Sequence, residues 1–200
     1  MNPGRRLCLV SMLLAAPMLS IAAQPSSLHT LDEAAPVAIN TRFLLIGPDG
    51  GAVSDDNFQG RFRLIAFGYA ACPDVCPTTL AEMADILKRL ETRADSIQAI
   101  FISVDPERDT PQFLKTYTAF FDPRILGLSG TPELVQRAAR NYKVRYARVY
   151  EGKQKSGFYA VDHAAGMFLV GPQGEFIKKF GFGTPSEQIA GEIAKLLPPQ

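Results

Sequence analysis

A chain of 200 residues with 46% apolar and 20% charged side chains is long enough to form one globular domain with a buried core. The composition excludes a largely disordered chain. The formal charge of +1 gives no electrostatic basis for binding nucleic acid or an anionic membrane surface. We therefore expect one folded domain and no nucleic-acid partner.

The amino-terminal residues have the order of a secretory signal peptide. Arg5 and Arg6 precede an apolar run from Leu7 to Ala23, which ends in small residues. The run is 17 residues long and contains Pro17, so it is short for a membrane span, which needs about 20 residues. We predict that residues 1–23 form a cleaved signal peptide, with a retained membrane anchor as the alternative. Either way the protein is exported, and we expect it in the periplasm, free or tethered to the inner membrane.

Residues 24–37 are polar, small and proline-containing, which predicts a flexible stalk ahead of a domain at 38–200. At the start of that domain, Phe43–Ile46 and Ala52–Ser54 flank a turn of Gly, Pro and Asp. This pattern predicts an antiparallel hairpin.

Buried strands and amphipathic helices alternate through the middle of the chain. Helix starts are marked by Thr110 and Thr131, each followed by proline, a combination typical of an N-cap and the first helical position. The expected strands are Arg63–Tyr69, Ile97–Val104 and Ile125–Leu128, and the expected helices are Thr78–Leu90, Pro111 to about Phe120, and a third from Pro132.

The last third of the chain has the pattern of antiparallel strands joined by turns. Tyr146–Tyr150 and Gly157–Val161 flank a basic loop at 151–155, and a tight turn joins strands at Gly166–Val170 and Glu175–Phe180, before a final helix at Pro185–Leu197. This element order predicts an α/β, thioredoxin-like three-layer sandwich with a mixed central sheet and an N-terminal hairpin extension.

Cys72 and Cys76 lie between the first buried strand and the first helix. They are open to three interpretations: a structural disulfide, a redox-active dithiol, or part of a metal site. The structural disulfide is the weakest, because so short a loop constrains the unfolded chain little. A helix start favours thiolate over thiol, which suits the other two.

His163 is the one histidine of the predicted domain, and it precedes the strand that ends at Val170. In a sandwich of this order, the segment before that strand lies beside the start of the first helix, so His163 and the cysteines should be neighbours. Two soft thiolates and one imidazole suit Cu(I), whereas a structural zinc site needs a fourth ligand. Asp74 is expected at the helix start. Asp162 is expected to lie in a turn or to support a metal ligand without binding the metal itself.

These motifs resemble the Sco/SenC family of copper-binding, thioredoxin-like proteins that help to assemble cytochrome c oxidase. The resemblance rests on Phe67-Gly68-Tyr69 before Cys72-Pro73-Asp74-Val75-Cys76-Pro77, on the run Phe101 to Pro111, and on Val161-Asp162-His163. It implies one copper ion per chain, as Cu(I) and in a second state as Cu(II), with Cys72, Cys76 and His163 as metal ligands. Ala71 departs from the family, which commonly has histidine or another polar residue there.

The resemblance further implies a metallochaperone, rather than an enzyme, that delivers copper to the copper A subunit of cytochrome c oxidase. Another copper carrier and a thiol-disulfide oxidoreductase are expected as further partners. The alternative is a thiol-disulfide oxidoreductase that acts on the cysteines of the oxidase subunit. A peroxidase is disfavoured, because the chain lacks the Thr-x-x-Cys pattern of peroxiredoxins. Arg145, Arg148 and the basic loop are a weaker candidate for contact with an acidic partner.

Overall fold

The computed structural model describes residues 38–150 and 159–197. The predicted signal peptide and stalk, at 1–23 and 24–37, lie outside the described residues. Within the described ranges, no helix has both the length and the apolar content needed to cross a membrane.

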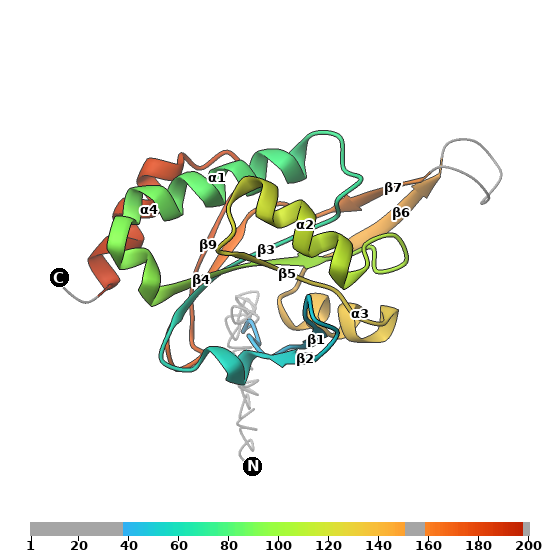
Figure 1. Cartoon of the computed structure of the whole chain (residues 1–200), viewed down its shortest axis with the longest axis horizontal. Helices are drawn as coiled ribbons and strands as arrows, with labels where there is room; N and C mark the ends of the chain where they lie inside the picture. Colours follow the sequence, from blue (N-terminus) through green and yellow to red (C-terminus); the bar gives the residue numbers. More distant parts are fainter. Residues whose placement is uncertain (1–37, 151–158, 198–200) are drawn as a thin grey trace, which may run out of the picture. The chain divides into compact units, whose positions relative to one another are not determined.

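A mixed five-stranded sheet forms the centre of the domain (Figure 1). Strands β3, β4 and β5 are mutually parallel, whereas β8 runs antiparallel to β3 and β9 antiparallel to β8. The order across the sheet is β5 (Ile125–Leu128), β4 (Ile97–Ser103), β3 (Phe62–Gly68), β8 (Met167–Val170) and β9 (Phe176–Phe180). This parallel half joined to an antiparallel half is the arrangement that the sequence predicted.

Helices cover both faces of the sheet (Figure 1). One face carries α1 (Val75–Leu90), α2 (Pro111–Phe121) and α4 (Ser186–Leu196), and the other carries α3 (Pro132–Asn141) with the β1–β2 hairpin (Leu44–Ile46 and Ala52–Ser54). Short 3-10 helices, η1 (Asp55–Phe58) and η2 (Glu91–Ser96), follow β2 and α1. The three-layer sandwich with an N-terminal hairpin is therefore confirmed.

The predicted caps of α2 and α3 are confirmed, because the Thr110 and Thr131 side chains accept hydrogen bonds from the backbone N–H groups of Phe113 and Leu134. The predicted start of α1 at Thr78 was wrong by three residues. Pro77 lies inside the first turn, where a helix needs no backbone N–H donor, so the proline does not delay the helix. Cys76 is consequently part of the helix itself.

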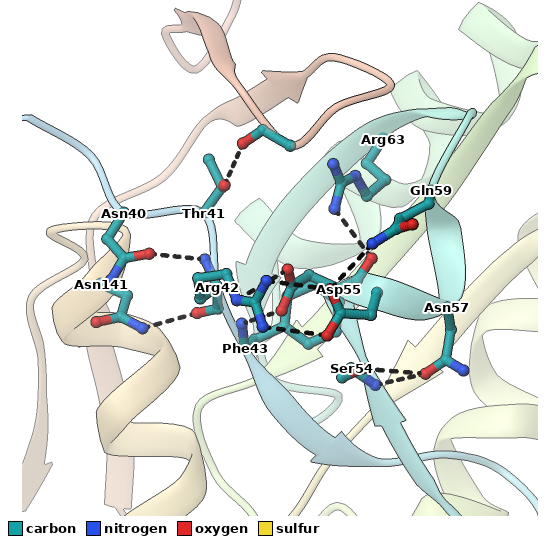
Figure 2. Close-up of polar contacts among 12 residues, drawn as sticks. Asn40, Thr41, Arg42, Phe43, Ser54, Asp55, Asn57, Gln59, Arg63 and Asn141 are labelled. Atoms are coloured by element: carbon teal, nitrogen blue, oxygen red, sulfur yellow. Dashed lines mark hydrogen bonds and ion pairs between the residues drawn. The ribbon is translucent and has the colours of Figure 1, made fainter.

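The N-terminal hairpin extension is anchored by Arg63, which Figure 2 shows reaching from the sheet toward η1. Arg63 is 1% exposed, and its guanidinium donates to the carbonyl oxygens of Asp55 and Gly171 at 3.2 and 2.9 Å. The Asp55 carboxylate accepts in turn from the backbone N–H of Phe43 at 3.1 Å. These contacts connect the segment before β1 with the central strand.

Strands β6 (Tyr146–Tyr150) and β7 (Tyr159–His163) form a separate antiparallel hairpin that projects beyond the central sheet (Figure 1). His163, expected just after this strand, is its last residue and pairs with Tyr146. The basic loop 151–155 lies outside the described residues.

Candidate metal centre

Residues 69–74, here called the cysteine turn, join the carboxyl end of β3 to α1. Cys72 is half-buried on the turn, whereas Cys76 is the second residue of α1 and is 2% exposed. Gly68 makes room for the Cys76 thiol, since a Cβ atom on Gly68 would lie 2.7 Å from Sγ. The backbone N–H of Tyr69 donates to the same sulfur at 3.4 Å. Cys76 is therefore held against the end of the central strand.

His163 completes the cluster from the β6–β7 hairpin. Its Nε2 lies 3.3 Å from Cys76 Sγ, and its ring meets the Tyr69 ring edge-on, with centroids 6.0 Å apart. The two sulfur atoms and a ring nitrogen of His163 all lie within 4.8 Å of one another. The neighbourhood of Cys72, Cys76 and His163 that the sequence predicted is therefore present in the structure.

The environment separates the two thiols electrostatically. Burial raises the pKa of Cys72, but backbone N–H groups at Asp74, Cys76 and Val75 outweigh that effect, so the net pKa is lowered. Burial strongly raises the pKa of Cys76, and the charges of Cys72 and Asp109 add to it, against the opposing N–H of Tyr69. The expectation that the helix start favours thiolate is correct for Cys72 and wrong for Cys76, because burial dominates there.

The environment of His163 favours the neutral imidazole over the imidazolium. Burial lowers its pKa, while the backbone of Ala164 and the charge of Asp162 oppose this effect without reversing it. A neutral ring has a nitrogen lone pair available for a metal, whereas an imidazolium has none. A cavity of about 320 Å³ opens beside His163 and is lined in part by Arg145, Tyr146 and Asp162. A larger cavity of about 510 Å³ lies elsewhere and includes none of the three cluster residues.

The donor set fits a soft metal. Two thiol sulfurs and one imidazole nitrogen match the preferences of Cu(I), and no carboxylate belongs to the cluster within the described residues. Asp74 is the N-cap residue of α1 without a capping hydrogen bond from its side chain, and Asp162 is an exposed residue of β7. The chain's other cysteine, Cys8 in the predicted leader, and its other histidine, His29 in the predicted stalk, lie outside the described residues.

Sequence reasoning gave no role to Asp109, which supports the cysteine turn. The Asp109 carboxylate is buried and accepts hydrogen bonds from the backbone N–H of Ala70 at 3.0 Å and from the Ser103 hydroxyl at 2.7 Å. Burial raises its pKa, with the hydrogen bond from Ser103 opposing. A signal for this role is present in the sequence, because Asp105 and Asp109 follow shortly after a buried strand. Aspartates that become buried in such a position are almost always paired with another group.

The chain is similar in sequence to proteins of a known family. The sequence model of the SCO1/SenC family matches residues 32–198, which include all three cluster residues. The chain belongs to the SCO1/SenC family. Curated relatives include the human protein SCO1 homolog, mitochondrial, which is 38% identical over 159 residues, and the Arabidopsis thaliana protein SCO1 homolog 1, mitochondrial, which is 35% identical over 159 residues. The matched regions cover 78% and 79% of this chain but only 52% and 47% of these relatives, so the chain spans about half of their length.

Solved structures of SCO1/SenC proteins share the thioredoxin-like fold. Bradyrhizobium japonicum ScoI with copper bound is 40% identical with a TM-score of 0.71, and the match covers 79% of this chain and 99% of that one. Arabidopsis thaliana ScoI with copper bound is 34% identical with a TM-score of 0.72, and the match covers 79% and 97% of the two chains. Both similar structures carry copper.

Proposed function

We propose that this protein is a metallochaperone that binds one copper ion through Cys72 Sγ, Cys76 Sγ and His163 Nε2. The proposal rests on one observation, the approach of two sulfurs and one imidazole nitrogen to within 4.8 Å of one another. Three soft or borderline donors without a carboxylate favour Cu(I) over zinc, magnesium or calcium. Copper in two SCO1/SenC structures of this fold supports the same choice.

The two thiols would serve copper capture differently. Cys72 is the more accessible, and its lowered pKa makes it the thiolate that first meets an incoming ion. Cys76 must lose its proton on binding, and the positive charge of the ion compensates for the burial that otherwise disfavours its thiolate. His163 binds as the neutral imidazole. Two thiolates and Cu(I) together carry a charge of −1, which the start of α1 offsets in part.

Delivery would proceed by ligand exchange. A thiolate or imidazole of the acceptor adds to the low-coordinate copper, and the chaperone's own ligands leave one at a time. Oxidation of Cys72 and Cys76 to a disulfide removes both sulfur ligands, so copper loading requires the reduced pair. Both cysteines are unpaired in the structure.

The acceptor in this proposal is the copper A subunit of cytochrome c oxidase. The membership in SCO1/SenC supports it, because BsSco is a member of the Sco family of cytochrome c oxidase assembly proteins, and it is 26% identical to this chain with a TM-score of 0.60. Delivery at an oxidase requires an exported protein, in agreement with the predicted leader at 1–23, cleaved or kept as a tether. A second copper carrier would load the site, and a thiol-disulfide oxidoreductase would keep it reduced.

A second candidate function is thiol-disulfide exchange on the cysteines of the oxidase subunit. The observation in its favour is the asymmetry of the thiols, because an accessible cysteine of lowered pKa beside a buried one of raised pKa suits attack followed by resolution. The disulfide switch identified in BsSco supports the same chemistry. The geometry with His163 favours metal binding as the main role.

Copper titration separates the two functions. The reduced wild-type chain should bind one Cu(I) in competition with a chromophoric chelator. His163→Ala should bind at least 10-fold more weakly, since even outer-shell changes at metal sites cost about 10- to 100-fold. The matched control is His29→Ala, which removes the chain's other histidine and should bind like wild type. Equal affinity in wild type and His163→Ala would remove His163 as a ligand and favour the oxidoreductase.

A further inference from the structure

The β6–β7 hairpin, which carries His163, packs on the core of the domain through Val161 and, in part, through Tyr146 and Tyr159. Its strands pair only with each other among the described strands. Within those strands Val161 is the one buried residue. Most residues of the two strands are therefore not buried, and polar contacts add to this apolar packing in holding His163 in place.

Four polar contacts connect the hairpin to the loop between β4 and α2. The Tyr159 hydroxyl donates to Asp105 Oδ1 at 2.8 Å, and the Arg108 guanidinium donates to the Tyr159 carbonyl oxygen at 3.0 Å. Arg148 of β6 forms an ion pair with Glu107 at 2.6 Å and a longer one with Asp105 at 4.0 Å. Asp105 is fully buried and also pairs with Arg108, which fixes these two loop residues, whereas the Glu107 side chain is exposed.

Arg108 adds contacts with two aromatic rings. Its guanidinium carbon lies 3.9 Å from the centroid of the Tyr159 ring and 5.5 Å from that of Tyr69. Tyr69 in turn meets the His163 ring edge-on. Nη2 of Arg108 is buried without a hydrogen-bond partner, so the rings are the groups that stabilise this part of the cation.

The same loop is tied to the cysteine turn at its other end. Asp109 accepts a hydrogen bond from the backbone N–H of Ala70, two residues before Cys72. The Ser103 hydroxyl, which donates to Asp109, also accepts from the backbone N–H of Asp105 at 3.0 Å. One loop is therefore bonded both to the hairpin that carries His163 and to the turn that carries Cys72.

We infer that Asp105, Glu107 and Arg108, with Tyr159 and Arg148, form a clasp that positions His163 against Cys76 before metal arrives. The clasp residues are positioning residues, because they act through His163. The inference rests on the proposed role of His163 as a copper ligand. A pre-positioned imidazole avoids the entropy cost of ordering the hairpin when copper binds.

The test is a double variant, Arg148→Gln with Tyr159→Phe. It removes the ion pairs of Arg148 with Glu107 and Asp105 and the hydrogen bond from Tyr159 to Asp105, and it leaves the pair of Asp105 and Arg108 intact. Its Cu(I) affinity should fall about 10-fold. Lys178→Gln is the matched control, since it breaks a comparable ion pair, with Glu192 at 2.6 Å, away from the hairpin. The control should bind copper like wild type.

Combination with His163→Ala distinguishes positioning from general damage. If the clasp acts through His163, the triple variant should bind copper no more weakly than His163→Ala alone. An additive loss, or an unchanged affinity in the double variant, would overturn the inference. If the double variant does not fold, Arg148→Gln alone, at a side chain 35% exposed, gives the same comparison.

A metal-free measurement keeps the clasp separate from the proposed function. Backbone 15N relaxation of Val161, Asp162 and His163 should show increased mobility in the double variant. The same residues should show no increase in mobility in Lys178→Gln. Unchanged relaxation would refute the clasp even if copper binds as proposed. Failure of wild type to bind copper would refute the proposed function, while increased mobility would still support the positioning of His163.

Discussion

His163 Nε2 lies 3.3 Å from Cys76 Sγ, although 87 residues separate the two in the sequence. One atom belongs to the first turn of α1 and the other to the end of the β6–β7 hairpin. No local structure joins these segments, so the contact exists only in the folded domain. Metal binding through this pair would therefore stabilise the native state over the unfolded chain.

The two cysteines should differ in reactivity toward alkylating reagents. Cys72 is half-buried with a pKa below its ordinary value of 9.0, whereas Cys76 is buried with a raised pKa. At neutral pH, iodoacetamide should label Cys72 first, and its rate should rise with pH to a midpoint below 9.0. Mass spectrometry of proteolytic peptides measures both rates in the reduced chain. Faster labelling of Cys76, or equal rates, would contradict the assigned environments.

The sequence predicted the elements and the cluster better than it predicted the environment of the cluster. The helix caps at Thr110 and Thr131 are local signals, because each threonine side chain accepts a hydrogen bond from the backbone N–H only three residues later. The pairing of His163 with the cysteines followed from strand order. The lowered pKa of Cys72 was predicted, because it comes from backbone N–H groups two to four residues away, whereas the raised pKa of Cys76 was not, because it depends on burial by residues distant in sequence. The role of Asp109 was missed for the same reason, as its partner Ala70 is 39 residues away.

A side chain at position 68 should require the neighbouring residues to shift. A Cβ atom there would lie 2.7 Å from Cys76 Sγ and 2.8 Å from the Phe101 ring, so one of them must shift. Gly68→Ala should destabilise the domain by about 1–3 kcal/mol through overpacking and should weaken copper binding. Urea denaturation and the chelator competition measure the two effects.

Gly191→Ala is the control for this substitution. Gly191 lies within α4, and a Cβ atom would meet nothing within 4 Å. Because alanine favours the helix over glycine, this change should stabilise the protein by about 0.5–1 kcal/mol and leave copper affinity unchanged. A neutral Gly68→Ala would mean that the cysteine turn adapts more freely than the contacts imply.

Asp109 should make a distinct contribution to the pH dependence of stability. Burial raises its folded pKa above the ordinary value of 3.8, so the native state holds this proton more tightly than the unfolded chain does. As pH rises from about 3.8 through the folded pKa, this group alone lowers the free energy of unfolding; above that range its effect is constant. Asp109→Asn removes the titration, so the stability of the variant relative to wild type should rise across the same window.

Urea denaturation of both proteins at a series of pH values measures this difference. Other carboxyl groups titrate in both chains and cancel in the comparison, provided that they are distant from residue 109. A difference that falls with rising pH would show that Asp109 is stabilised as a carboxylate, against the dominant effect of its burial.

Arg63 should contribute far more to stability than its neighbour Arg42, although both bond to the segment Asp55–Phe58 (Figure 2). Arg63 is 1% exposed, so Arg63→Ala leaves a cavity and removes the guanidinium donor from the carbonyl oxygens of Asp55 and Gly171, although Gly171 keeps a hydrogen bond from the backbone N–H of Gly174. The expected loss is about 3 kcal/mol. Arg63→Met refills the volume without restoring the donors and should recover part of that loss of stability.

Arg42→Ala is the exposed counterpart, because it removes ion pairs from a side chain 62% exposed. It should cost less than about 1 kcal/mol, with urea denaturation as the measurement for all three variants. Similar losses for Arg63→Ala and Arg42→Ala would show that the buried guanidinium costs as much to desolvate as its hydrogen bonds return.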